Sequence, residues 1–375
     1  MKDHYDICFV CFEELRADAR TLNISRTFAK HGKRVAIIAP ATSDEVQQYA
    51  KDKIKVLPMK IRKQKRYWKK WFGFNFEINK YKKINAKAVW ANDFHSLFAA
   101  IRIAKRKNSQ LLYDSREIYS ALGPLAENKF KQAIITQLEQ RLVQRVDNII
   151  VSGPMDAEYL KDHFNTDHPY SIIMNLPPYS EYKESNKIRE ELGISKETKV
   201  ILYQGLLIKG RGIIPVIRAL QYIEDCVFVL IGWGPHVDDF NQIAESLHVG
   251  DRVFFLGKKS YDELFEYTAS ADLGIAYIEP ITLSYRLALP NKLFEYCMAR
   301  IPSLVSDLPA MREVINQHRI GELIEVGAEP SKFAFVMGKM LIENEKYKQE
   351  CEIASKIYSY DTQETEILQL LSDEE

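Results

Sequence analysis

The stretch from Leu289 to Pro302 holds the residue types whose spacing points most directly to chemistry. Pro290 suits the first turn of a helix, and Pro302 ends that helix before the apolar run Ser303–Val305. The pattern therefore predicts a loop, a short helix and then a strand. At about 100° per residue, the helix has an apolar stripe and an opposite, more polar face. The stripe comprises Leu293, Phe294, Cys297 and Met298, and the opposite face comprises Lys292, Glu295, Tyr296 and Ala299.

Lys292 is an unusual residue for the first turn of a helix. The positive end of the helix dipole opposes a cation there by roughly 0.3 to 1 kcal/mol, and a bound anion removes that conflict. Free N–H groups at a helix start, with one lysine beside them, can hold a phosphate. Glu295, one turn further on, can accept two hydroxyl hydrogen bonds. Phosphate together with sugar hydroxyls indicates a nucleotide, whereas the simpler alternative is a core helix with a solvated polar face.

Elements able to position this helix recur along the whole chain. Short β-branched runs alternate with helical patterns in two series, separated at Met174–Tyr179 by an interdomain linker. This rhythm predicts two parallel sheets covered by helices on both faces, with ligands bound at the carboxyl ends of the strands. The predicted strands are residues 5–10, 34–39, 53–57, 88–91, 111–113 and 148–151, and then 200–203, 227–231, 253–256, 272–276 and 302–305.

The loops after these strands differ between the two halves. In the first half they are polar, at Phe12–Arg20, Asn92–His95 and Asp114–Glu117. Helix capping by Asp93 or Ser96 explains part of that polarity. In the second half the loops are rich in glycine, which lets backbone N–H groups approach a ligand, and one of them also contains Lys209 and Arg211. These loops are Gly205–Gly212, Gly232–Pro235 and Gly257–Lys259. None has the P-loop or dinucleotide-binding glycine pattern.

Bulk composition narrows the class of protein. The 375 residues predict two domains, and the formal net charge of +1 gives no global signal for nucleic acid. No run of about 18 apolar residues is present and the first residues lack a signal-peptide core, so we expect a cytoplasmic protein. The five cysteines suit reduced, buried thiols, and the Cys8–Cys11 pair has no second pair to complete a zinc site.

The segment from Lys60 to Lys83 departs from this balance. It contains ten lysines and arginines against one acid, Glu77, with seven aromatic residues between them. Basic residues with interleaved aromatics suit an anionic membrane surface or a phosphate-bearing lipid acceptor. RNA binding uses the same residue types, and a solvated loop that contributes some aromatics to the core needs no partner.

Several of these stretches resemble the family-four glycosyltransferases, which have the GT-B fold and retain anomeric configuration. The resemblance rests on Pro290–Tyr296, Tyr203–Gly205 with Gly210–Gly212, Ile231–Pro235, Asp251–Gly257 and Ala269–Ile275. It implies two Rossmann-like domains facing each other across a cleft: residues 1–176 for the acceptor and residues 177–355 for the nucleotide-sugar donor. Residues 356–375 would form a C-terminal helix that returns to the first domain.

The resemblance also implies roles for individual residues. Glu295 would bind the donor ribose, Arg211 the pyrophosphate, and the helix start at Lys292 those same phosphates, with His95 beside the donor sugar. The remaining donor-binding residues would be Gly205, Lys209, Gly212, Gly232, Gly234, Gly257, Asn291 and Leu293. The acceptor side would comprise Arg20, Asp93, Arg116 and Glu117.

Three positions depart from the family pattern. Leu287 stands where the family has the first of two glutamates, and the nearest acid upstream is Glu279. Leu206 stands where an arginine often follows the loop glycine, and Arg116 where many relatives have histidine. These departures concern the donor-sugar contacts rather than the nucleotide site.

The resemblance implies that a hexosyl or N-acetylhexosaminyl group moves from a nucleotide-diphosphate sugar to a hydroxyl, with retention and without a metal or other cofactor. The acceptor would be a glycan or a lipid-linked molecule of bacterial surface synthesis, met at the inner face of the membrane, and no nucleic acid is expected. A nucleotide-sugar epimerase of the same fold and a non-catalytic sugar-binding or scaffold protein are the alternatives.

Overall fold

The structure is a computed structural model that describes residues 4–15, 18–60, 66–121 and 128–371, except for the side chains of residues 261 and 262. The chain forms two compact units, here called unit 1 and unit 2. Unit 1 comprises the residues up to Met174 and those from Gln363 onward, and unit 2 is Asn175–Thr362. The sequence analysis begins the returning tail at residue 356, whereas the chain rejoins unit 1 only at Gln363.

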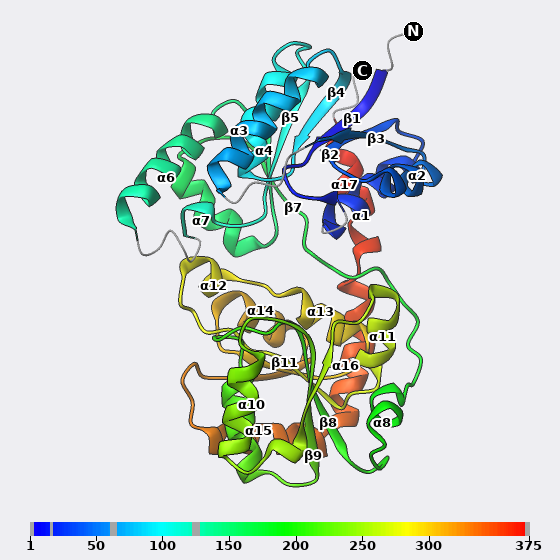
Figure 1. The fold of residues 1–375 in the computed structure, drawn as a ribbon, viewed down its shortest axis with the longest axis vertical. Coiled ribbons are helices and arrows are strands. Elements are labelled where there is room, and N and C mark those ends of the chain that lie inside the picture. The colour runs from blue at the N-terminus through cyan, green and yellow to red at the C-terminus, as the bar shows by residue number, and fades with distance from the viewer. Residues whose placement is uncertain (1–3, 16–17, 61–65, 122–127, 372–375) are drawn as a thin grey trace. The chain divides into compact units, whose positions relative to one another are not determined.

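Unit 1 is built on a seven-stranded parallel sheet with the order β3-β2-β1-β4-β5-β6-β7 (Figure 1). Its strands are β1 His4–Val10, β2 Val35–Pro40, β3 Ile54–Met59, β4 Asn85–Ala91, β5 Gln110–Ser115, β6 Asn148–Val151 and β7 Tyr170–Ile172. Its helices are α1 Ala19–Lys30, α2 Ser43–Lys51, α3 Tyr67–Glu77, α4 Phe94–Ala104, α6 Lys129–Val143, α7 Pro154–Phe164 and α17 Glu364–Gln369, with 3-10 turns η2 Ile78–Tyr81 and η3 Tyr119–Ala121.

The C-terminal helix α17 belongs to unit 1 because side chains and backbone fix it there. The Lys30 ammonium donates to the Glu364 carboxylate at 2.8 Å, and the Gln110 amide donates to the Leu370 carbonyl at 3.0 Å. These contacts join residues more than 250 positions apart in sequence. The expected return of a C-terminal helix to the first domain is therefore present in α17.

Unit 2 repeats the design with a six-stranded parallel sheet in the order β10-β9-β8-β11-β12-β13. Its strands are β8 Lys199–Leu206, β9 Cys226–Trp233, β10 Val253–Gly257, β11 Leu273–Ala276, β12 Ser303–Ser306 and β13 Gly321–Ile324. Its helices are α8 Lys187–Leu192, α9 Ile213–Ala219, α10 Val237–Ser246, α11 Tyr261–Ala269, α12 Leu283–Leu287, α13 Asn291–Met298, α14 Pro309–Gln317, α15 Pro330–Ile342 and α16 Asn344–Ile357. Three 3-10 turns complete the elements: η4 Leu220–Tyr222, η5 Gly250–Arg252 and, ending in unit 1, η6 Tyr360–Gln363.

The predicted parallel strands are confirmed, and two further strands escaped prediction. β7 and β13 each lie at the edge of a sheet and have three and four residues. β13 starts with Gly321 and Glu322, and β7 is half-buried throughout, so neither shows the continuous apolar run of a buried strand. The prediction that the five cysteines are buried thiols is also confirmed.

Candidate functional site

The helix that the sequence analysis selected as the centre of the site is α13, Asn291–Met298. It begins after Pro290, whose extended backbone serves as N-cap without a side-chain hydrogen bond, and β12 follows it, as the sequence predicted. The apolar stripe is buried, but the opposite face differs from the prediction, because Tyr296 and Ala299 are buried as well. The Tyr296 hydroxyl accepts the backbone N–H of Gln204 at 3.0 Å, which holds the helix against β8.

Glu295 is one of the two polar groups left half-buried in the middle of this helix face. Its Oε2 accepts a hydrogen bond of 2.5 Å from the side-chain amide of Gln204. The other end of that amide, the Gln204 oxygen, lies 2.8 Å from the Thr268 hydroxyl on α11. Burial raises the pKa of Glu295, and the Gln204 hydrogen bond and the nearby Lys292 offset only part of that rise. Gln204 therefore favours the ionised carboxylate and fixes its orientation.

Lys292 supplies a cation one turn away from Glu295. Its Nζ lies 3.5 Å from the centroid of the Tyr203 ring, and the Tyr203 hydroxyl donates to the Leu206 carbonyl at 2.8 Å. Burial, followed by the charge of Arg211, lowers the pKa of Lys292 well below its ordinary value, while Glu295 acts in the opposite direction. An anion placed beside Lys292 would restore the charged form.

Arg211 is the second cation at this place. Its guanidinium lies 4.3 Å from the ring centroid of Tyr285 on α12, a cation–π arrangement like that of Lys292 on Tyr203. Within the part of the chain that the structure describes, neither Arg211 nor Lys292 forms an ion pair with a carboxylate. Two basic side chains held by aromatic rings are thus left for an anionic ligand, which would also favour the charged form of Lys292.

The glycine-rich strand ends lie directly beside these cations. Gly205 of β8 pairs with Gly232 of β9 in the sheet register. A Cβ on Gly232 would stand 1.8 Å from the Gly205 carbonyl oxygen, so only glycine fits there. A Cβ on Gly205 would in turn meet the Lys292 Nζ at 3.7 Å. Because the two strands approach so closely, the backbone at Gly205 is exposed next to the Lys292 ammonium group.

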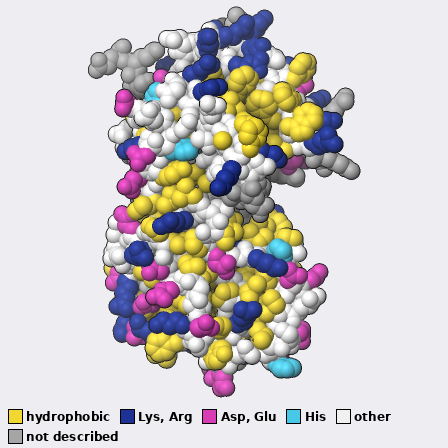
Figure 2. Space-filling model, turned by 90° about the vertical axis from the view of Figure 1, so that its left-hand side faces the viewer, with side chains coloured by type: hydrophobic (Ala, Val, Ile, Leu, Met, Phe, Trp, Pro, Cys, Tyr) yellow, Lys and Arg dark blue, Asp and Glu magenta, His cyan; other side chains and the backbone are white. Residues whose placement is uncertain are grey.

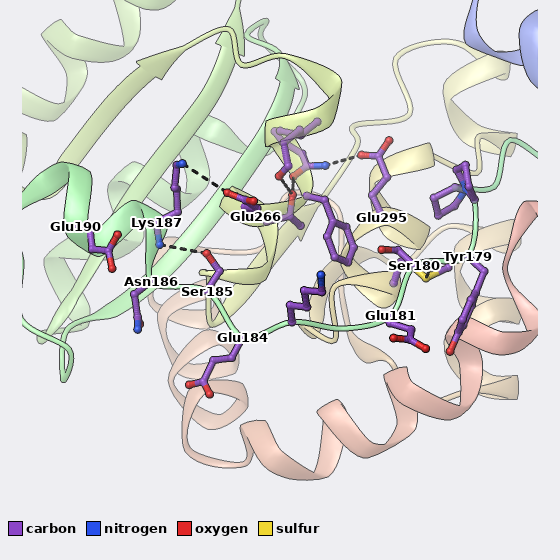
Figure 3. A pocket seen from close by; sticks show the side chains of 18 residues that line it. Tyr179, Ser180, Glu181, Glu184, Ser185, Asn186, Lys187, Glu190, Glu266 and Glu295 are labelled. Carbon is purple, nitrogen blue, oxygen red and sulfur yellow. Dashed lines mark hydrogen bonds and ion pairs between the residues drawn. The ribbon is translucent and has the colours of Figure 1, made fainter.

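A pocket of about 850 Å³ opens at Glu295 (Figure 3). Glu295, Gln204 and Thr268 line it on one side, and the segment after Pro177 with helices α8 and α11 encloses the rest. A volume of this size lies within the range of about 300–1,000 Å³ that is usual for small-molecule sites. Every residue that lines the pocket belongs to unit 2.

The other residues expected at the donor site have different surroundings. Lys209 pairs with Asp239 of α10 at 3.2 Å and shares a shallow groove with that helix rather than with Glu295. The side chain of Leu293 is in the core, and its backbone N–H donates to the Pro290 carbonyl at 3.0 Å. At this helix start, the N–H groups of Asn291 and Lys292 are therefore the ones left for a ligand. The three remaining glycines are Gly212 at the start of α9, Gly234 after β9 and Gly257 at the end of β10.

Glu279 lies nearer to the site than its sequence position indicated. Its backbone N–H donates to the Gly210 carbonyl at 2.9 Å, and its carboxylate would lie 3.8 Å from a Cβ on Gly210. Leu287, where the family has its first glutamate, ends α12. An acid is therefore present beside the loop of Arg211, although it comes from a different stretch of sequence.

The expected acceptor residues Arg20 and Arg116 form a buried ionic cluster in unit 1. The Arg20 guanidinium makes two hydrogen bonds to Asp114, at 2.9 and 3.0 Å, and Arg116 bonds Asp114 at 3.0 Å and Asp18 at 2.7 Å. Although burial opposes it, Arg116 together with Thr21 lowers the pKa of Asp18. The cluster joins the start of α1 to the carboxyl end of β5, which gives both arginines structural contacts.

His95, Asp93 and Glu117 also lie in unit 1, at the ends of β4 and β5. Asp93 caps α4 and accepts the Ser96 N–H at 2.7 Å, as the capping interpretation predicted. The imidazole of His95 lies 5.1–5.6 Å from four aromatic rings, those of Phe12, Tyr67, Phe94 and Tyr119. Burial lowers the pKa of His95, partly offset by Asp93, so the ring is neutral at neutral pH. Glu117 is exposed after β5.

Sequence reasoning missed four residues that position the donor-site charges. Tyr203 and Gln204 entered the sequence analysis only as part of the stretch Tyr203–Gly205, without roles of their own. The packing of α13 on β8 shows what they contact. Thr268 and Tyr285 lie on separate helices and carried no signal at all.

The described ranges of the chain contain no group of three or more histidine, cysteine, aspartate or glutamate side chains arranged to hold a metal ion. They also contain no helix with the length and apolar character needed to cross a membrane.

Known protein families match both halves of the chain. Residues 184–356 match the family model described as glycosyl transferases group 1, and residues 17–175 match that described as glycosyl transferase 4-like domain. The chain belongs to the group 1 glycosyltransferases. Like other proteins of this family, it has two parallel-sheet domains of the GT-B fold, and the sequence analysis is confirmed to that extent.

Individual relatives of this glycosyltransferase are distant. It is 28% identical over 148 residues to the N-acetyl-alpha-D-glucosaminyl L-malate synthase of Bacillus anthracis. The aligned region covers 39% of this chain and 37% of the relative. The chain thus spans less than half the length of the curated relatives it matches.

Solved structures extend the similarity of the fold to nearly the whole chain. Sucrose-phosphate synthase from Thermosynechococcus elongatus has a TM-score of 0.79 at 14% identity, covering 97% of each chain. Anabaena HepE in complex with UDP has a TM-score of 0.75 at 16% identity, covering 98% of this chain and 99% of HepE.

Proposed function

We propose that this protein transfers a sugar from a nucleotide-diphosphate sugar to a hydroxyl acceptor. The observation that carries the proposal is the pair of basic side chains Lys292 and Arg211, which have no carboxylate partner in the described residues. Lys292 lies close to both Arg211 and Glu295. The diphosphate would lie against Lys292, Arg211 and the exposed backbone at Gly205. The ribose hydroxyls would donate to the carboxylate that Gln204 holds in place.

Charge on the leaving group explains how this arrangement would promote transfer. The bond between the anomeric carbon and the phosphate oxygen breaks while positive charge develops on the sugar. Two fixed cations stabilise the departing diphosphate, and removal of one preorganised group of this kind costs about 2.7 to 4 kcal/mol. We propose that the protein's own cations suffice, so that transfer persists in the presence of a chelator.

The finer features are part of the same proposal. Retention of configuration rests on the resemblance of Pro290–Tyr296 to the family-four motif. A hexosyl or N-acetylhexosaminyl donor is supported by the name of the Bacillus relative and by the UDP-glucose complex of HepE. We propose an acceptor on a bacterial surface glycan or glycolipid, supported by the exposed basic and aromatic segment of unit 1.

A titration of the purified chain with UDP, GDP, TDP, CMP and NAD tests the proposal. We expect one nucleoside diphosphate to bind, and Glu295→Ala and Arg211→Ala each to weaken it while the fold stays intact. Lys209→Ala is the matched control, because that lysine pairs with Asp239 instead. Unchanged affinity in both site variants would refute the site, and donor turnover without acceptor would indicate an epimerase.

A further inference from the structure

Helix α3 of unit 1 turns a row of large apolar side chains toward solvent. Trp68, Phe72 and Phe76 keep 53%, 61% and 74% of their surface exposed, and they recur every four residues. At about 100° per residue they fall on one side of the helix. Phe74 and Ile78, on another side, are fully buried. The three exposed aromatic side chains therefore do not belong to the core, and a purely structural role does not explain why they are there.

The apolar surface continues onto α4. Phe98 is 37% exposed, and its ring lies 5.9 Å from Trp71, which in turn lies 5.3 Å from Phe72. We call Trp68, Phe72, Phe76 and Phe98 the α3–α4 surface. Figure 2 shows hydrophobic side chains gathered beside lysine and arginine side chains on the upper part of the molecule, which is unit 1. Contiguous exposed apolar surface of this kind marks an interaction site.

Positive charge surrounds the α3–α4 surface. Arg66, Lys69 and Lys83 are exposed, and the Lys69 ammonium lies 5.5 Å from the Trp68 ring centroid. Glu77, the single acid between Lys60 and Lys83, is already neutralised by Lys80 at 2.5 Å. Arg62, Lys63 and Lys65 lie outside the described residues. The partner of this surface must therefore offer both apolar groups and negative charge.

These two demands are met together by an anionic lipid bilayer. An amphipathic helix lying in the membrane interface presents aromatic side chains to the acyl boundary, and flanking lysines meet the anionic headgroups. Single-stranded nucleic acid would instead need a basic groove with rings on which bases stack. The rings of α3 form a protruding row on a helix, and Trp68 and Phe72 meet edge-on at 6.2 Å and 84°. That geometry favours insertion over base stacking.

We propose that the α3–α4 surface docks unit 1 on an anionic membrane. Docking uses Trp68, Phe72 and Phe76 as the inserted groups and the surrounding lysines as the headgroup contacts. It does not depend on the nucleotide site, because every residue involved belongs to unit 1. It would keep the acceptor-binding unit at the lipid surface.

Vesicle co-sedimentation of the full chain tests this inference. Vesicles of phosphatidylcholine alone are compared with vesicles of equal parts phosphatidylcholine and phosphatidylglycerol. We expect binding to the second kind, weakened by added salt, and a loss of at least about tenfold in Phe72→Ser/Phe76→Ser, since each buried ring contributes strongly to partitioning. Lys69→Glu/Lys83→Glu should lose the preference for anionic lipid.

Matched controls exclude general effects of the substitutions. Phe335→Ser/Ile342→Ser removes side chains of unit 2 that are 68% and 87% exposed, and it should leave vesicle binding unchanged. Thermal unfolding should be unaltered in every variant, because none of these side chains is buried. Binding to neither kind of vesicle would overturn the inference. An equal loss of vesicle binding in the Phe335→Ser/Ile342→Ser control would also overturn it. A further contrary result would be binding of a single-stranded RNA oligonucleotide that Phe72→Ser/Phe76→Ser abolishes and that vesicles do not displace.

Discussion

Replacing Gln204 by leucine tests how the carboxylate of Glu295 is held. Gln204 is 3% exposed, and its amide is the hydrogen-bond donor that the structure gives to Glu295 Oε2, at 2.5 Å. A hydrogen bond to a charged group contributes about 1.5 to 3 kcal/mol, which corresponds to roughly 10- to 150-fold in an equilibrium constant. Leucine has a similar volume but offers no donor, so the substitution removes the hydrogen bond to the Glu295 carboxylate.

The sign of the pH dependence follows from the same contact. The Gln204 hydrogen bond lowers the pKa of Glu295, against the larger rise caused by burial. Gln204→Leu therefore raises that pKa further and leaves more of the carboxyl protonated at neutral pH. Because the proposed contact with both ribose hydroxyls needs the ionised form, we expect affinity to fall at least about tenfold at neutral pH. On acidification, affinity should be lost at a higher pH in Gln204→Leu than in the wild type.

Calorimetric titration measures this change in affinity. The ligands are UDP, or whichever nucleoside diphosphate binds the wild type, and the 2′,3′-dideoxy analogue of that nucleotide. The wild type should prefer the nucleotide with both hydroxyls, and Gln204→Leu should lose that preference. A ratio of two affinities does not depend on the fraction of folded protein. Gln242→Leu on the exposed face of α10 is the control for the same change of side chain.

Two outcomes distinguish the role of Gln204 from the existence of the donor site. A Gln204→Leu protein with wild-type affinity and full preference for the ribose hydroxyls would refute the role of Gln204 alone. A wild type that binds no nucleotide would instead refute the proposed donor site.

Two further predictions concern stability. Gly232→Ala should destabilise the protein by more than about 3 kcal/mol in chemical denaturation, because its Cβ would collide with the Gly205 carbonyl. Gly327→Ala, which has a positive φ but open space around it, should cost only about 1 kcal/mol. Arg116→Met should cost about 3 kcal/mol by leaving Asp18 and Asp114 short of a partner. The folded-state pKa of Asp18 lies below its unfolded value, so ionised Asp18 stabilises the folded wild type. The wild type should lose this stabilisation as the pH falls below about 4, whereas Arg116→Met should lose less stability over the same pH range. An acid unfolding midpoint equal in both proteins would contradict this assignment.

Much of the fold followed from local sequence patterns. The parallel strands, the capped start of α4 at Asp93 and the short helix after Pro290 each depend on neighbouring residues along the chain. The edge strands β7 and β13 did not follow, because short strands at a sheet edge lack a continuous apolar run. The point near Gln363 where the chain returns to unit 1 also did not follow, because no local pattern of residues marks where a chain changes units.

The sequence by itself determined that Lys292 and Glu295 share a helix and that Arg211 lies in a glycine-rich loop, because these relations span few residues. Only the tertiary structure decided what holds those charges: Gln204 on Glu295, Tyr203 under Lys292 and Tyr285 under Arg211. It likewise separated the aromatics of α3 into buried and exposed sets. Such contacts join residues tens of positions apart, and their energies depend on packing and burial, which no local spacing encodes.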